Sequence, residues 1–220
     1  MINMNGAPDS RTRRAGGWGL VFVVLLLIGA GMASVPGGDD SVAQVRRFYE
    51  EHTGVILLSQ IVELIATLPL VLFLLGLAVS TLVGAKRYAL LAGGAMVIAS
   101  LVTLIPPLML VLVHHSASAG RVHALAELSD LTDVLLFVTI TGFAACGWAG
   151  HGPTWFRWLA MLVGLAAAVR AVAILFSGDP LEVLAPLGFI ALVVAFSVLL
   201  LRGERRVASP RSHAAPDALE

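Results

Sequence analysis

The chain has 220 residues, of which 58% are hydrophobic and only 13% are charged, and its mean hydropathy is +0.92. This composition is too apolar for an ordinary water-soluble domain and is typical of a protein that crosses the lipid bilayer several times. The formal net charge is zero, so the overall charge predicts no nucleic-acid partner. The single cysteine, Cys146, excludes an internal disulfide and a cysteine-based metal cluster.

Six stretches approach the ~20 apolar residues that a helix needs to cross a bilayer core. We expect these spans at about residues 18–36, 55–83, 89–113, 124–148, 158–177 and 183–201. Residues 1–17 are polar and basic, and residues 202–220 mix charge with Pro, Ser and Ala, which is typical of disordered tails. The predicted fold is therefore all-α, a polytopic bundle of six transmembrane helices.

The first of these stretches has two interpretations. Arginines precede it and small residues at 31–34 end it, which is also the pattern of a cleaved signal peptide. The apolar run from Trp18 to Val35 is long for a signal peptide and sufficient for a span. We expect an uncleaved first helix, with cleavage as the alternative.

The lysines and arginines predict the orientation of the helices. In the six-span arrangement ten of them fall on one side, namely Arg11, Arg13, Arg14, Lys86, Arg87, Arg157, Arg202, Arg205, Arg206 and Arg211. Three fall on the other side, namely Arg46, Arg47 and Arg121. The positive-inside rule then places both termini in the cytoplasm, and we expect the chain in a bacterial plasma membrane.

Residues 37–54, between the first two spans, are predicted to lie outside as an amphipathic segment. Asp40 or Ser41 can cap a helix, and Ser41 and Gln44 have the spacing of a capping box. An apolar stripe follows, made of Val42, Val45, Phe48 and Tyr49. We expect a short helix on the outer membrane interface, which serves either as a lid over the bundle or as a plain connector.

The second and third spans carry features that a plain apolar helix lacks. Gln60, Glu63 and Thr67 are spaced three and four residues apart and so share one helix face. Pro69 removes one backbone hydrogen bond and can bend the second span. In the third span, the pair at 106–107 is Pro-Pro, which frees backbone carbonyls that need other partners at membrane depth.

The fourth span is unusual because acidic residues stand at its outer end. His123, Glu127, Asp130 and Asp133 recur every three or four residues, so they lie on one face of the predicted helix. A carboxylate facing hydrocarbon costs at least ~2.5 kcal/mol. We therefore expect this acidic face to contact protein or water.

A charged residue also interrupts the fifth span, at Arg170. The rise of 1.5 Å per residue puts Glu63 at ~12 Å, Asp133 at ~13 Å and Arg170 at ~10 Å from the outer ends of their helices. Intramembrane charges usually pair with one another, so we expect Arg170 to bridge Asp133 or Glu63. The surplus acid can relay a proton, act as a general acid or hold a cationic ligand.

Three functions remain open. In the first, the acid and arginine cluster of Glu63, Asp133, Arg170, Asp130, Glu127, Gln60 and His123 binds or moves a proton or a small polar or cationic ligand. In the second, the protein is a membrane enzyme that uses Glu63 or Asp133 as general acid on a lipid or isoprenoid. In the third, it is a structural subunit of a larger assembly with a membrane-protein partner. His123 and Glu127 lack a specific metal motif such as HExxH, so neither a metal nor a cofactor is predicted.

Residues 153–172 read PTWFRWLAMLVGLAAAVRAV, in which Pro153, Trp155, Trp158 and Leu159 lead into a helix rich in small residues. With this segment, six spans and an acidic outer end on the fourth, the chain resembles small bacterial integral membrane proteins grouped as domains of unknown function. The resemblance covers most of residues 17–202 and implies a six-helix fold without a particular activity. The buried acids alone are similar to those of integral-membrane terpene cyclases, which implies the enzymatic alternative.

Overall fold

The structure is a computed structural model that describes residues 10–32, 40–80, 82–83, 86–176 and 181–202. Its regular elements in these ranges are the helices α1 (Ser10–Met32), α2 (Val42–Ala78), α3 (Lys86–Thr103), α4 (Ile105–Val113), α5 (Ala119–Trp148), α6 (Thr154–Leu175) and α7 (Leu184–Arg202). With α3 and α4 taken together, 6 helical segments of the described chain are long and apolar enough to cross a membrane. The predicted all-α fold with six spans is confirmed.

Each predicted span overlaps one helical segment, and the differences lie at the ends. α1 begins at Ser10, within the expected polar tail, because its first turns pack against the end of α7. A Cβ atom at Gly16 would lie only 2.6 Å from the carbonyl oxygen of Ser197 on α7, so the two helices touch closely there. Of the predicted tail at 202–220, Arg202 is the last residue of α7, and the remainder lies outside the described residues, as does the possible cleavage point after residue 32.

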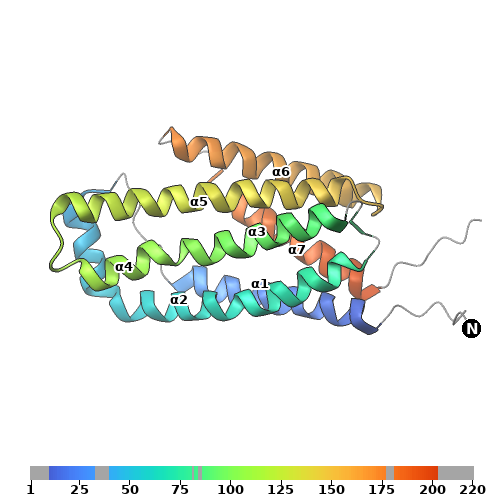
Figure 1. Cartoon of the computed structure of the whole chain (residues 1–220), viewed down its shortest axis with the longest axis horizontal. Coiled ribbons are helices and arrows are strands. Elements are labelled where there is room, and N and C mark those ends of the chain that lie inside the picture. Colours follow the sequence, from blue (N-terminus) through green and yellow to red (C-terminus); the bar gives the residue numbers. More distant parts are fainter. Residues whose placement is uncertain (1–9, 33–39, 81, 84–85, 177–180, 203–220) are drawn as a thin grey trace, which may run out of the picture.

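The spans form a ring in which each packs against the next along the chain. α1 packs most extensively on α2 and α5 on α6, and the ring closes where α7 returns to α1. Because the connections are short, successive helices run antiparallel. Ser10 and Arg202 consequently lie at the same end of the bundle (Figure 1).

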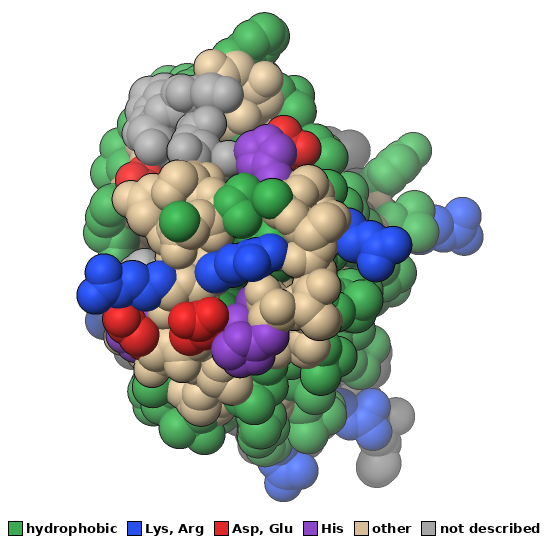
Figure 2. Space-filling model, turned by 90° about the vertical axis from the view of Figure 1, so that its left-hand side faces the viewer, with side chains coloured by type: hydrophobic (Ala, Val, Ile, Leu, Met, Phe, Trp, Pro, Cys, Tyr) green, Lys and Arg blue, Asp and Glu red, His purple; other side chains and the backbone are tan. Residues whose placement is uncertain are grey.

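The two ends of the bundle differ in charge. The end that carries Ser10 and Arg202, here the basic end, holds Arg11, Arg13, Arg14, Lys86, Arg87, Arg157 and Arg202 and no described Asp or Glu. The opposite end, here the capped end, carries both signs and several histidines. Figure 2 looks onto the capped end and shows these charged side chains gathered within a rim of hydrophobic ones.

The first turns of α2 cover the capped end. Ser41 begins the helix with the predicted capping box, because its side chain accepts a hydrogen bond from the Gln44 backbone and Gln44 Oε1 accepts one from the Ser41 backbone. These turns cross the end of the bundle at a large angle to the rest of α2 (Figure 1). We expected a separate amphipathic segment at residues 37–54; instead the helix continues from Val42 into the second span.

The third span is divided in two at Leu104. α3 ends before this residue and α4 begins after it, with Pro106 and Pro107 in the first turn of α4, where a missing backbone N–H is tolerated. Pro69, in contrast, lies inside α2 without ending it. The third span thus consists of two helices, although the sequence predicted one stretch at residues 89–113.

Buried apolar side chains form two separate clusters. The large cluster extends from the basic end past the middle of the bundle and contains Phe73, Phe143, Phe156 and Phe196, with the rings of Phe156 and Phe196 4.5 Å apart. The small cluster lies below the capped end and consists of Val45, Tyr49, Ile56, Leu110, Ala117 and Val122. The segment of the bundle between them is where the charged residues of the spans lie.

Candidate functional site

A polar layer separates the two apolar clusters. On α2 it falls between Ile56 of the small cluster and Ala66 of the large one, and on α5 between Val122 and Phe137. We define the polar layer by Ser59, Gln60 and Glu63 of α2, Asp130 and Asp133 of α5, and Arg170 of α6. Polar side chains at this depth face the interior because lipid offers them no hydrogen-bond partners.

Asp133 is the electrostatic centre of the polar layer. Its carboxylate interacts with Asp130 on its own helix, with Arg170 on α6 and with Glu63 on α2. The like charges repel Asp133 and the guanidinium attracts it, and each of these side chains is only partly exposed. The three helices therefore bring together the charges that the sequence placed at one level, while a direct ion pair of Arg170 with Asp133 or Glu63 stays a prediction.

Glu63 is held by a neighbour on its own helix and one on α1. The Ser59 hydroxyl lies 3.2 Å from Glu63 Oε1 and 3.0 Å from the backbone carbonyl oxygen of Gly29. Gly29 leaves the space that Glu63 occupies, because a Cβ atom there would lie 2.7 Å from Glu63 Cγ. Neither of these two neighbours had a role predicted from the sequence: the four-residue spacing of Ser59 and Glu63 is a usable signal, but nothing in the sequence marks Gly29.

Gln60 contributes a buried acceptor. Its side chain is 6% exposed, and its Oε1 has no hydrogen-bond partner among the described residues. Leaving a buried acceptor unsatisfied costs about 1–3 kcal/mol, so such an atom calls for an explanation. A ligand that donates a hydrogen bond in the polar layer would supply the partner.

His123 and Glu127 lie outside the polar layer. His123 Nε2 is 3.2 Å from Glu127 Oε1, and both side chains are about half exposed or more at the capped end. The predicted polar face of α5 therefore splits into an exposed pair and a partly buried pair, Asp130 and Asp133. Across the described residues, no three His, Cys, Asp or Glu side chains gather closely enough to hold a metal ion.

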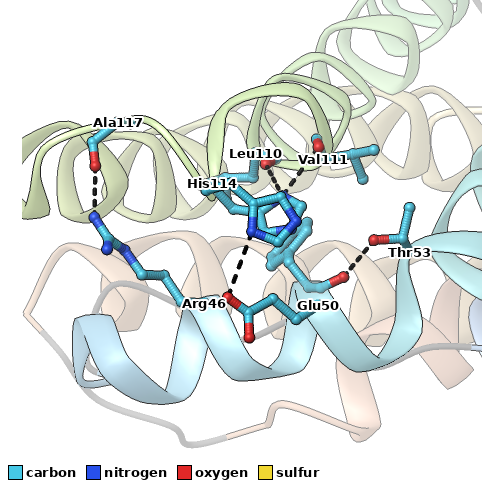
Figure 3. Close-up of polar contacts among 9 residues, drawn as sticks. Arg46, Glu50, Thr53, Leu110, Val111, His114 and Ala117 are labelled. Atoms are coloured by element: carbon cyan, nitrogen blue, oxygen red, sulfur yellow. Dashed lines mark hydrogen bonds and ion pairs between the residues drawn. The ribbon is translucent and has the colours of Figure 1, made fainter.

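A second polar group lies where the first turns of α2 meet the α4–α5 connection (Figure 3). Arg46 Nη2 donates a hydrogen bond to the backbone carbonyl of Ala117, and the exposed pair of His115 and Glu50 lies 3.5 Å apart. His114 stands at the start of the turn after α4, as the C-cap of that helix, and is 3% exposed. Packing of α2 over the connection buries it.

His114 and Tyr49 face one another within this group. Their ring centroids are 6.1 Å apart, and Tyr49 is fully buried. His114 Nδ1 lies 3.0 Å from the carbonyl oxygens of Leu110 and Val111, which accept hydrogen bonds, so Nδ1 carries a proton. The buried atoms His114 Nε2, Tyr49 Oη and Arg46 Nε have no hydrogen-bond partner among the described residues.

The chain was compared with protein-family models, curated proteins and solved structures. No family model matches it, and no curated protein or solved structure matches it either. The function is therefore inferred from the polar layer and its surroundings.

Proposed function

We propose that the polar layer binds a proton or a small organic cation with N–H donors, in an integral membrane protein. The observation that carries this proposal is the excess of acceptors around Asp133. Within the described part of the layer, the carboxylates of Glu63, Asp130 and Asp133 accompany the single guanidinium of Arg170. A bound cation would offset the repulsion that these carboxylates exert on one another.

The hydrogen-bonding groups of the layer also favour a cationic ligand with N–H donors. Carboxylates and an amide oxygen accept hydrogen bonds, and the Ser59 hydroxyl has one hydrogen to share between Glu63 and the Gly29 carbonyl. Gln60 Oε1 adds a buried acceptor that lacks a donor. An ammonium group brings several N–H donors and one positive charge, so it complements both the charge and the hydrogen-bonding pattern.

The difference between the ends supports an orientation. A concentration of Lys and Arg at the basic end fits the cytoplasmic side of a plasma membrane under the positive-inside rule. Exposed aromatic side chains ring the same end, namely Trp18, Tyr88, Trp148, Trp155 and Trp158. Such amphipathic rings favour the membrane interface, so both termini are proposed to lie in the cytoplasm and the capped end outside.

The experiment is a ligand-dependent stability measurement on detergent-purified protein. Ammonium, methylammonium and ethylammonium are added at increasing concentration, and the thermal unfolding midpoint is recorded for wild type, Glu63→Gln and Asp133→Asn. Glu127→Gln is the matched control, because Glu127 is an acid of the same helix face that lies exposed outside the layer. At a concentration 100-fold above Kd, binding stabilises the folded state by about 2.7 kcal/mol.

We expect stabilisation by at least one of these cations in wild type and in Glu127→Gln and its loss in the other two variants. Proton movement is measured on the same proteins in liposomes loaded with a pH-sensitive dye, under an imposed membrane potential. Absence of both cation-dependent stabilisation and proton flux in wild type refutes the proposal. In that case, a lower unfolding midpoint in Glu63→Gln and Asp133→Asn favours the interpretation as a structural subunit. A lipid product that is made by wild type and lost in both variants favours the interpretation as a membrane enzyme.

A further inference from the structure

We infer that the first turns of α2 form a gate that closes the polar layer toward the capped end. We define this gate by Arg46 and Tyr49 of α2 together with His114 and Ala117 of the α4–α5 connection. The inference rests on the proposed binding role of the polar layer and assigns the side from which a ligand enters it.

The two apolar clusters form barriers of very different thickness. Toward the basic end, the polar layer is closed by the large cluster with its interlocked Phe73, Phe143, Phe156 and Phe196 rings. Toward the capped end, the described residues form the much smaller cluster of six buried side chains, with a few partly buried ones packed against it. Ile56, which is fully buried and one turn from Ser59 and Gln60, is the last buried apolar side chain of α2 before the layer. Entry through the small cluster therefore disrupts far less packing.

The closed gate also buries polar atoms without partners. Tyr49 Oη, Arg46 Nε and His114 Nε2 all lie at the contact between the first turns of α2 and the α4–α5 connection. Movement of these turns would return the three atoms to water, which offsets part of the cost of exposing Val45 and Tyr49. The closed arrangement is accordingly less stable than its apolar contacts alone would make it.

One hydrogen bond fastens the gate, and the helix is weak where the gate joins the span. Arg46 Nη2 donates to the Ala117 carbonyl across the contact (Figure 3). At the other end of the gate, the hydroxyl of Thr53 donates a hydrogen bond to the Tyr49 carbonyl, and such a bond favours bending of the helix. The next residue is Gly54, where a Cβ atom would meet no other atom within 4 Å. The first turns can thus move as a unit about this point.

The test measures access of a reagent to the polar layer and needs no ligand. In a Cys146→Ala background, Gln60→Cys provides a reporter thiol, and its rate of reaction with a membrane-impermeant thiosulfonate is measured from each side of membrane vesicles. Glu51→Cys and Lys86→Cys, at exposed positions of the two ends, identify which side each end faces. We expect the reporter to react from the side of the capped end.

Two gate variants should change this rate in opposite directions. Arg46→Ala removes the fastening hydrogen bond and is expected to raise the rate roughly tenfold. Arg47→Ala is the matched control, because Arg47 is an exposed neighbour whose side chain pairs with Glu51, and it should leave the rate within about twofold. Tyr49→Phe removes a buried hydroxyl that has no partner, which favours the closed gate and should lower the rate several-fold.

The inference is overturned if Arg46→Ala and Arg47→Ala react equally fast, or if the reporter reacts from the side of the basic end. Tyr49→Phe keeps the test decisive if Arg46→Ala does not fold, because an unchanged or faster rate in Tyr49→Phe also contradicts the gate. The reaction rates are measured without a ligand, so they still test the gate if no cation binds in the stability experiment. A failure of the gate and a failure of the proposed function can therefore be distinguished.

Discussion

The Ser59 hydroxyl on α2 lies 3.0 Å from the carbonyl oxygen of Gly29 on α1, which joins the two helices at the level of Glu63. Gly29→Ala would place a Cβ atom 2.7 Å from Glu63 Cγ. Because the packed helices can yield only partly, we expect a loss of about 1–3 kcal/mol in the free energy of unfolding. The measurement is reversible unfolding in mixed micelles.

Gly17→Ala on the same helix is the control, since a Cβ at Gly17 would meet no atom within 4 Å. There the better helix propensity of alanine should leave stability unchanged or raise it by about 0.5–1 kcal/mol. Shortening the opposing side chain in Gly29→Ala with Glu63→Ala should recover part of the loss. Equal effects at the two glycines would show that the contact with Glu63 does not limit packing.

Arg170 is expected to stabilise the folded state by attracting the carboxylate of Asp133. Arg170→Gln leaves the repulsion among Asp133, Asp130 and Glu63 without this attraction, so stability should fall. Asp133→Asn combined with Arg170→Gln should cost less than the sum of the single changes, with a coupling of about 1–3 kcal/mol. Additive losses in this double-mutant cycle would contradict a direct interaction between the two side chains.

The Gln60 side chain is expected to lower the stability of the folded protein and to strengthen the binding of the ligand. Gln60→Met keeps the length of the side chain and removes the buried acceptor that has no partner, so the free energy of unfolding is expected to rise by about 1–2 kcal/mol. The same variant should bind the stabilising alkylammonium ion about tenfold more weakly, because it has lost an acceptor for the ligand's N–H group. Titrations of the unfolding midpoint measure both effects.

Thr67→Val is the control for Gln60→Met on the same helix. The hydroxyl of Thr67 donates to the backbone carbonyl of Leu64 at 2.6 Å, and Thr67 lies one turn beyond Glu63, outside the polar layer. This change should leave cation binding unaltered. A loss of binding in Thr67→Val equal to that in Gln60→Met would show that the effect does not come from the acceptor.

The helices and their polar faces could be predicted from the sequence because they depend on local patterns. Apolar runs near 20 residues long identified the spans, and the spacing of Gln60 and Glu63 and of Asp130 and Asp133 identified the faces that turn inward. Counting the rise per residue was enough to place Asp133 at the depth of Glu63 and Arg170, since their three helices cross the same bilayer.

The remaining features depend on how helices meet, which a local pattern does not record. The role of Gly29 follows from close packing of α1 on α2, and a glycine in an apolar helix has many other uses. The burial of His114 against Tyr49 follows from the change of direction in α2, which brings its first turns onto the α4–α5 connection (Figure 1). In the sequence, His114 stands beside the polar residues of a turn, and nothing in the local pattern marks it as buried.

Two buried serines differ in their hydrogen bonds. Replacing each by alanine therefore distinguishes the cost of burying an unsatisfied hydroxyl from the general effect of losing a serine side chain. Ser197 on α7 is fully buried, and its Oγ has no hydrogen-bond partner among the residues that the structure describes. Ser80, also buried, donates to the Leu77 carbonyl at 2.7 Å and accepts from the Leu82 backbone at 3.3 Å. Ser197→Ala should therefore raise the free energy of unfolding by up to about 1 kcal/mol, whereas Ser80→Ala should lower it by about 1 kcal/mol.

The comparison is made by reversible unfolding of both variants under one set of conditions. Each substitution removes the same atom from a buried site, so the apolar contribution is matched and the sign of the change reports the hydrogen bonds. A loss of similar size in both variants would mean that the Ser197 hydroxyl has a partner in the folded protein, such as a bound water molecule. In that case the unpartnered atoms of Tyr49 and Gln60 would need the same direct test before binding or gating is assigned to them.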